Sequence, residues 1–146
     1  MAERALDPGQ RQKVYESFAR HGLMKAIGGC LVRVERGHVE VELPYSDAVT
    51  QQHGYFHAAA VTAIADNAGG YAALTLMQPD EEVVAVEFKV NLLRPAVGPR
   101  LVAMATVLRA GRTIVVTHVV VSALLESGAV EVAVMLQTNF RVSKKR

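Results

Sequence analysis

The residue of greatest chemical interest is Asp66, which lies within a run of apolar residues from Ala58 to Met77. A carboxylate in such surroundings is costly to ionise unless it has a partner or a function, and desolvation raises its pKa. Such a group is suited to act as a general base that takes a proton from water. An isolated Asp in an apolar helix can also be a structural partner for Lys, Arg or backbone amides, and that alternative stays open.

A second feature comes directly before this run. The glycine-containing stretch Gln51–Phe56 leads into a helix that we expect to begin at His57-Ala58. The unpaired N–H groups of a helix N-terminus, together with the helix dipole, favour developing negative charge. An N–H donor and a poised base suit the attack of water on a carbonyl carbon. His57 taken alone is also typical of an ordinary residue at a helix start.

The spacing of these two features limits how they can cooperate. Asp66 follows His57 by nine residues, which corresponds to about 13 Å along a helix axis. Within one chain the two groups cannot contact the same carbonyl. We therefore expect the site to need a second, antiparallel copy of the helix across a dimer interface.

The elements that must position these residues follow from hydrophobic periodicity. The pattern predicts a helix from Gln10 to Arg20 that starts at Asp7-Pro8 and stops at Gly22, strands over residues 30–35 and 39–43, the helix Ala58–Met77, and strands Val83–Leu93, Leu101–Arg109, Thr113–Leu125 and Val130–Val142. The short connections between the last strands indicate antiparallel pairing. Alternation predicts that Val84 and Phe88 share one face of their strand and that Cys30 is a small core residue.

The order of these elements predicts the fold class. The middle helix is apolar on essentially every face, so a sheet must wrap around it. We therefore expect an α+β hotdog fold, a curved antiparallel sheet around a long central helix. The expected organisation is a single domain over residues 1–146, with residues 1–22 as an N-terminal helical extension and residues 143–146 as a basic tail. The edge strands of such a sheet have unpaired backbone groups, and pairing with a second chain would satisfy them, so we expect at least a dimer.

Composition excludes several classes of protein. The net charge is +2, and basic residues do not cluster on a periodic face with aromatic residues, so no nucleic-acid partner is expected. The apolar run carries Asp66 and Asn67, which favours a buried helix over a membrane span. The first residues have no signal-peptide pattern and the single cysteine cannot form an internal disulfide, so we expect a cytoplasmic protein. His21 and His38 are assigned to turns, and no residues have metal-ligand spacing.

The motifs above carry a family resemblance. The pattern Gly54-x-x-His57-x8-Asp66-x-Ala68 resembles the signature of PaaI-type hotdog thioesterases of the phenylacetate pathway. The segment Val86–Ala96 is similar to the third strand and following turn of that family, and the likeness runs from about residue 20 to 142. The resemblance implies an acyl-CoA thioesterase with no cofactor beyond water. We expect a homodimer as the minimum catalytic unit and a homotetramer as the assembly, with the choice between a dimer and a pair of dimers left open by the sequence.

The resemblance further implies roles for individual residues. Asp66 is expected to be the general base or nucleophile, the N–H of Ala58 to polarise the thioester carbonyl, His57 to orient this region or stabilise the departing thiolate, and Gln51 to position water or substrate. Arg94 and the turn Gly111-Arg112-Thr113 match regions that approach the nucleotide end of coenzyme A, where arginine forks suit phosphates. Gly54 and Asn67 complete the expected substrate-binding set.

Two positions depart from the family pattern. Relatives usually have His-Gly-Gly where this chain has His57-Ala58-Ala59. Alanine still supplies its N–H, but its Cβ narrows the approach of substrate. Some relatives have a Ser or Thr on the third strand where this chain has Ala85. These differences concern rate and substrate range rather than fold.

Two other functions remain as alternatives. A hotdog hydratase or dehydratase would need an acid and base around Cα and Cβ of the acyl chain, which Asp66 and a partner's histidine could imitate. A non-catalytic acyl-CoA binding module has little reason to bury a carboxylate beside an apolar acyl tunnel. The expected substrate is an acyl-CoA with an aryl or medium-chain acyl group, although the sequence does not fix that group or the pathway.

Overall fold

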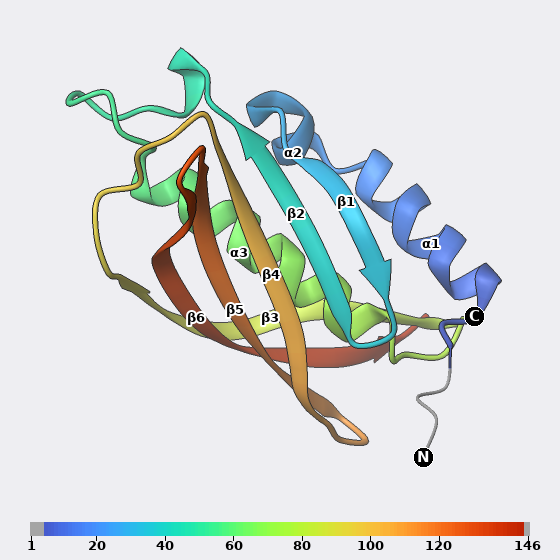
Figure 1. Ribbon diagram of the computed structural model, residues 1–146. Helices are drawn as coiled ribbons and strands as arrows, with labels where there is room; N and C mark the ends of the chain where they lie inside the picture. Colours follow the sequence, from blue (N-terminus) through green and yellow to red (C-terminus); the bar gives the residue numbers. More distant parts are fainter. Residues whose placement is uncertain (1–4, 145–146) are drawn as a thin grey trace.

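The long apolar segment forms one helix, α3 (Ala58–Leu74), at the centre of the fold (Figure 1). The protein is described by a computed structural model that covers residues 5–144. Most side chains of α3 are buried, including Val61, Ile64 and Ala68. The helix ends earlier than predicted, and Thr75 caps it. The Thr75 hydroxyl also accepts the N–H of Gly37 (2.8 Å), which ties the helix end to a hairpin of the sheet.

A single antiparallel sheet curves around α3 (Figure 1). Within residues 5–144 its strands are β1 (Cys30–Glu35), β2 (His38–Pro44), β3 (Glu81–Leu92), β4 (Arg100–Ala110), β5 (Ile114–Leu125) and β6 (Gly128–Ser143). Their order is β1-β2-β4-β5-β6-β3, so β1 and β3 are the two edges. A short 3₁₀ turn, η1 (Asp47–Val49), follows β2. This arrangement confirms the predicted α+β hotdog architecture.

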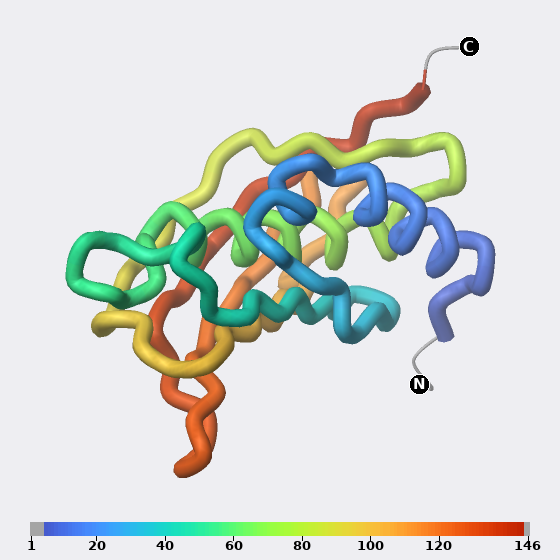
Figure 2. Tube along the Cα trace, turned by 90° about the horizontal axis from the view of Figure 1, so that it is seen from above, coloured from blue at the N-terminus to red at the C-terminus, as the bar shows by residue number. Residues whose placement is uncertain are grey.

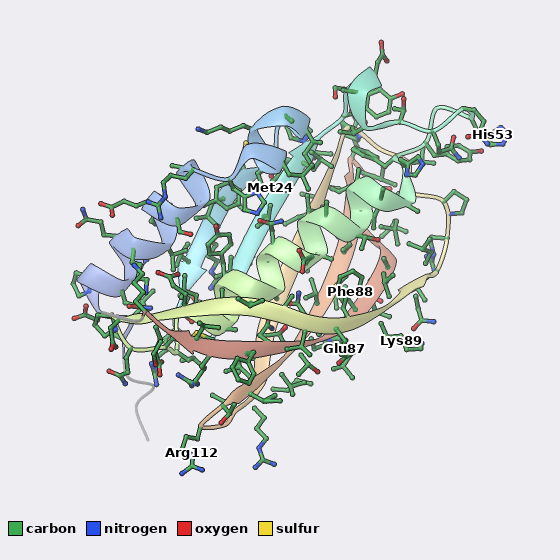
Figure 3. All side chains as sticks on the ribbon, turned by 180° about the vertical axis from the view of Figure 1, so that it is seen from behind. Met24, His53, Glu87, Phe88, Lys89 and Arg112 are labelled. Atoms are coloured by element: carbon green, nitrogen blue, oxygen red, sulfur yellow. The ribbon has the colours of Figure 1, made fainter. Side chains whose placement is uncertain are left out.

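Strand β3 contains a β-bulge that changes which side chains face the helix. Its pairing with β6 shifts register halfway along the strand, so Val84 points to the outer face of the sheet, whereas Phe88 pairs with the inward-facing Gln137. Figure 3 shows Phe88 on the α3 side of β3, and Glu87 and Lys89 on the other side. The prediction that Val84 and Phe88 share a face was therefore wrong, because a bulge interrupts the period of two.

A second bulge affects the start of β1. The register with β2 shifts between Leu31 and Arg33, which leaves Cys30 and Val32 exposed and buries Val34. The prediction of Cys30 as a core residue was wrong for this reason.

Two helices precede the sheet. Helix α1 (Pro8–Ala19) begins where predicted, because Asp7 Oδ1 accepts the N–H groups of Gly9 (2.9 Å) and Gln10 (3.2 Å). Gly22 does not end the helical region as predicted. It begins a second helix, α2 (Gly22–Ile27), which ends at Gly28 in the left-handed conformation with φ of 82°.

The N-terminal helices lie beside α3, in the gap between the two edges of the sheet (Figure 2). The Gln10 side chain donates to the carbonyl of Leu74 (2.6 Å), and the hydroxyls of Ser17 and Tyr71 share a hydrogen bond (3.2 Å). The rings of Phe18 and Tyr71 are in contact, with centroids 5.6 Å apart. These contacts fix α1 against the side of α3 that the sheet leaves open.

Between residues 5 and 144, none of the helices has the combination of length and apolar character that a membrane crossing requires.

Candidate functional site

The loop before α3 is a closed turn that brings Gln51 to the start of the helix. The N–H of Gln51 donates to the carbonyl of Tyr55 (2.9 Å), and the N–H of Gly54 donates back to the carbonyl of Gln51 (3.0 Å). Gly54 has φ of 80°, a conformation that favours glycine. The side-chain oxygen of Gln51 accepts the N–H of His53. Gly54 thus shapes the loop, while Gln51 is held at the helix N-terminus.

His57 is the N-cap of α3. Its Nδ1 accepts the N–H of Ala59 (2.9 Å), so the neutral ring carries its proton on Nε2 and can donate from there. The carbonyl of His57 accepts from Ala60 (2.9 Å) and Val61 (3.1 Å). Within residues 5–144, no hydrogen-bond partner is found for the N–H of Ala58. One backbone donor at the positive end of the helix is therefore available to a ligand.

A cavity of about 490 Å³, here called the tip cavity, opens at this helix N-terminus. Its wall brings together four of the residues predicted from the sequence, namely Gln51, His57, Ala58 and Arg94. Leu92 and other apolar residues line the remainder. This combination of an apolar wall with a few polar groups around an N–H donor is typical of a small-molecule site.

Asp66 lies in a different cavity of about 210 Å³, here called the Asp66 cavity. Its wall also includes His21 from the α1–α2 junction, Tyr71 from α3 and Ala85 from β3. Burial raises the pKa of the Asp66 carboxyl, while a hydrogen bond from Gln137 and the charge of His21 oppose the rise. The carboxylate is therefore set up as a base stronger than an ordinary aspartate. Ala85 places a methyl group, not a hydroxyl, beside it.

The direct partner of Asp66 is Gln137 on β6, which the sequence analysis missed. Its Nε2 donates to Asp66 Oδ1 (2.5 Å) and more weakly to the Asp66 carbonyl (3.3 Å). Thr117 and Asn139 each donate to Gln137 Oε1 (3.3 Å), and all three of these side chains are fully buried. The signal was available, because Thr117 on β5 and Gln137 and Asn139 on β6 are polar residues at inward positions, while the remaining inward residues of these strands are apolar.

Gly69 allows this polar cluster to approach the helix. A Cβ on Gly69 would lie 2.1 Å from Gln137 Oε1 and 2.9 Å from Thr117 Oγ1, which is too close for atoms that are not bonded to each other. At the neighbouring Gly70 the nearest atom, Asn139 Oδ1, would be 4.0 Å away. The absence of a side chain at position 69 is therefore what lets Gln137 reach Asp66.

The structure does not bring all the predicted residues together within one chain. Asp66 and Ala58 line different cavities, as the helix geometry required. Asn67 lies in the Asp66 cavity rather than the tip cavity, and its amide donates to the carbonyl of Ala63 (3.0 Å). Its Oδ1 is buried and has no partner within the described part of the chain.

The turn Gly111-Arg112-Thr113 lies far from the tip cavity in the same chain. Figure 3 shows Arg112 and His53 at opposite ends of the molecule. The turn is held by Arg141, whose Nε donates to the carbonyl of Gly111 (3.0 Å) and whose backbone N–H donates to the carbonyl of Thr113 (2.9 Å). If Arg94 and Arg112 contact one ligand, they must come from different subunits.

Over residues 5–144, no three His, Cys, Asp or Glu side chains are grouped closely enough to hold a metal ion.

Comparison with known proteins places the chain in a family. Residues 53–126, which include both Ala58 and Asp66, match the thioesterase superfamily. The chain is 39% identical to a thioesterase family protein from Silicibacter pomeroyi, with a TM-score of 0.90 over 92% of this chain and 99% of that one. It is also 30% identical over 92 residues to a 1,4-dihydroxy-2-naphthoyl-CoA hydrolase of Listeria monocytogenes. These aligned residues make up 63% of this chain and 75% of the relative.

The PaaI protein of E. coli, from the phenylacetic acid degradation operon, has the same fold, with a TM-score of 0.83 and 20% identity over 96% of this chain and 98% of that one. The resemblance to PaaI-type hotdog thioesterases is confirmed by the family match together with this shared fold. The chain belongs to the thioesterase superfamily and is a thioester hydrolase with the hotdog fold.

Proposed function

We propose that the protein hydrolyses acyl-CoA thioesters at sites shared between two antiparallel subunits. The observation that carries the proposal is the position of two complementary groups on one helix. The free N–H of Ala58 and the poised carboxylate of Asp66 are eight residues apart on α3 and line separate cavities. A second copy of α3 running in the opposite direction would bring one group of each kind to the same thioester.

Strand β3 supports this mode of association. It is a long edge strand with unpaired backbone groups along its outer side. Phe88 and Leu92 face the α3 side of the sheet, yet they are 44% and 54% exposed. Antiparallel pairing of two β3 strands would satisfy the edge, cover these side chains and place the two α3 helices side by side.

Asp66 is proposed to act as a general base. It takes a proton from a water molecule whose oxygen attacks the thioester carbon, and the resulting oxyanion accepts a hydrogen bond from the N–H of Ala58 of the partner subunit. Collapse of the intermediate breaks the C–S bond and releases the acid. The proton that Asp66 took from water then passes to the thiolate of CoA, which restores the base. Direct attack by Asp66 is the competing route. A single turnover in H₂¹⁸O tests this route. Heavy oxygen on Asp66 would require an anhydride between Asp66 and the acyl group that water opens at the Asp66 carbonyl, whereas general-base catalysis places the heavy oxygen in the released acid alone.

The other residues of the tip cavity have proposed roles in binding and positioning. The Nε2–H of His57 can donate to the thioester sulfur, and Gln51 can orient substrate or water. Arg94 and Arg112 are exposed and form no ion pair within the described part of the chain. Their guanidinium groups suit the phosphates of coenzyme A. The Listeria relative, whose name describes a CoA thioester hydrolase, supports CoA as the thiol.

We further propose that two dimers associate through the outer face of the sheet. Val84, Phe140 and Ile114 are cross-strand neighbours on β3, β6 and β5, and all three are exposed on that face. Leu136 extends the same row of apolar side chains. Such a surface usually marks an interface. A Phe140→Glu variant should sediment as a dimer that remains active.

We also propose that the protein acts in the cytoplasm and that water is the only co-reactant of the hydrolysis.

Subunit complementation tests the shared site. Ala58 is the first residue of α3, where proline is tolerated, so Ala58→Pro removes the N–H donor without disturbing the helix. Asp66→Asn removes the base. Each variant alone should release little thiol from a panel of acyl-CoAs that runs from acetyl through aryl to long-chain.

A one-to-one mixture of the two variants, refolded together, should regain about one quarter of wild-type activity, because half of the dimers are mixed and each has one intact site. If both groups acted within one chain, the mixture would stay inactive. Ala58→Ser, which keeps the N–H, is the matched control and should retain activity.

A further inference from the structure

The side chain of His21 lies on the wall of the Asp66 cavity, and neither the family motif nor the proposed mechanism gives it a role. His21 is the N-cap of α2, but its side chain makes no capping hydrogen bond. Instead the ring lines the same cavity as Asp66. Its Nδ1 is buried and has no hydrogen-bond partner within the described part of the chain. A buried ring nitrogen normally has a partner, so this one calls for a water molecule or a ligand in the cavity.

The cavity is large enough to supply that partner. Its volume of about 210 Å³ has room for a few water molecules. Asn67 and Asn139 each present a buried Oδ1 without a partner, and both residues line the same cavity. Ordered water that satisfies these atoms would also connect the His21 ring to the carboxylate of Asp66.

The corner of the chain that carries His21 is held firmly against α3. The hydroxyls of Ser17 and Tyr71 share a hydrogen bond, and the ring of Phe18 packs on the ring of Tyr71. The N–H of His21 donates to the carbonyl of Phe18 (3.0 Å). The position of the imidazole relative to Asp66 is therefore set by the packing of α1 and not by a free loop.

The charged and titratable groups around the carboxylate are few. His21 comes from the α1–α2 junction, Tyr71 from α3 itself and Glu82 from β3, while β6 contributes only neutral amides. Glu82 is already paired with Lys13 (3.5 Å) and Lys144 (2.9 Å). Arg20, at the end of α1, acts on Tyr71. Among these groups on the cavity wall, His21 is thus the one that can carry a positive charge, and that charge lowers the pKa of the Asp66 carboxyl.

We propose that His21 is a positioning residue of the hydrolytic site, which acts through ordered water to hold Asp66 in place as an anion. The N-terminal helices would then be part of the active site rather than a packing extension. This inference rests on the proposed role of Asp66 as the base and deepens it.

The test is the pH dependence of thiol release in His21→Gln. Loss of the cation should move the ascending limb of kcat/KM to higher pH by about half a pH unit, which is roughly a threefold lower rate on that limb, with little change on the plateau or in KM. His21→Lys, which keeps a positive charge, should restore the limb. His118→Gln, on the outer face of the sheet, is the matched control. A uniform fall at every pH, or an unmoved limb, would overturn the proposal.

A second measurement separates this proposal from the proposed function. Carbon-13 NMR of the aspartate carboxyls, with the Asp66 resonance assigned by its loss in Asp66→Asn, gives the pKa of Asp66 without any turnover. In His21→Gln the titration should move to higher pH, and an unmoved titration contradicts the role of His21. If the titration moves but Asp66→Asn still hydrolyses thioesters, the proposed mechanism fails while the link between His21 and Asp66 stands.

Discussion

The tip cavity and the Asp66 cavity lie along the same helix, but different kinds of chemical group form their functional parts. In the tip cavity the free N–H is positioned by a surface loop that is closed by its own hydrogen bonds and by the His57 cap, while side chains such as Leu92 and Arg94 complete the wall. The Asp66 cavity uses side chains from α1, α3, β3 and β6, of which Asn67, Tyr71 and Asn139 are buried. The difference teaches that the proposed oxyanion donor depends on local conformation, whereas the proposed base depends on tertiary packing. Substitutions should therefore affect the two halves differently.

The largest effect is expected from Asp66→Asn, which should lower kcat/KM for acyl-CoA by about 10²- to 10⁴-fold. Burial raises the pKa of the folded carboxyl, so its ionisation costs stability as the pH rises through that pKa. The variant should therefore melt at a higher temperature than the wild type at neutral pH, and the difference should vanish at pH values below the pKa of the unfolded chain. Thiol release and thermal melts across pH measure both effects. Equal melting temperatures of the variant and the wild type at neutral pH would show that ionisation of the buried carboxyl does not lower the stability of the fold.

Ala58→Pro should cost somewhat less, about 10²- to 10³-fold in kcat, since it removes one oxyanion donor. Unlike Asp66→Asn, it should leave the pH dependence of stability unchanged, because the tip cavity uses backbone groups. Single-turnover thiol release together with circular dichroism checks this. Loss of helix content would mean that the substitution acts on folding, and the comparison between the two cavities would then not be tested.

Gly69→Ala and Gly70→Ala form a matched pair for the packing of the Asp66 cavity. The Cβ at position 69 meets Gln137 and Thr117, so this variant should lose about 1–3 kcal/mol of stability. At position 70 the Cβ has room, and the better helix propensity of alanine should add about 0.5–1 kcal/mol. Urea unfolding of both variants measures the contrast. Two changes of the same sign would show that the cluster can shift away from α3.

The smallest expected effect on rate is that of Gln137→Leu. Loss of its hydrogen bond raises the pKa of Asp66, so the ascending limb of kcat/KM should move to higher pH while the plateau changes little. The same variant should be less stable by about 1–3 kcal/mol, because it leaves Thr117 and Asn139 with fewer partners. Gln12→Leu, at an exposed position of α1, is the control and should change neither. A limb that stays in place would remove Gln137 from the electrostatics of the base.

The half of the site built from local conformation was predictable from the sequence. The apolar period, the glycine in the loop and the His57-x8-Asp66 spacing lie within a short stretch of chain. They correctly predicted α3 and its N-terminus, while the need for a second helix stays a prediction. The order of strands and the start of α1 at Asp7-Pro8 were predictable for the same reason, since each rests on neighbouring residues.

The bulges, helix α2 and the long-range neighbours of Asp66 could not be predicted from local sequence patterns. The bulges in β1 and β3 insert one residue into a regular alternation, and nothing in the alternating pattern of Val32 or Val86 marks the inserted position. Helix α2 begins at a glycine, which normally indicates an end. Gln137 contacts Asp66 from a position 71 residues away in the sequence, and His21 lines the same cavity from a position 45 residues away. Their contacts depend on how α1 and β6 pack on α3, which no local pattern reports.

The separation of donor and base along α3 has a consequence for regulation by mass action. In the proposed mechanism a lone chain would hold half of two sites and the whole of none, so the catalyst would exist only while two chains are associated. Specific activity should fall as the protein is diluted through its dimer dissociation constant, and a substrate that bridges both chains should oppose that dissociation. The cellular abundance of the protein would then control turnover more steeply than in direct proportion.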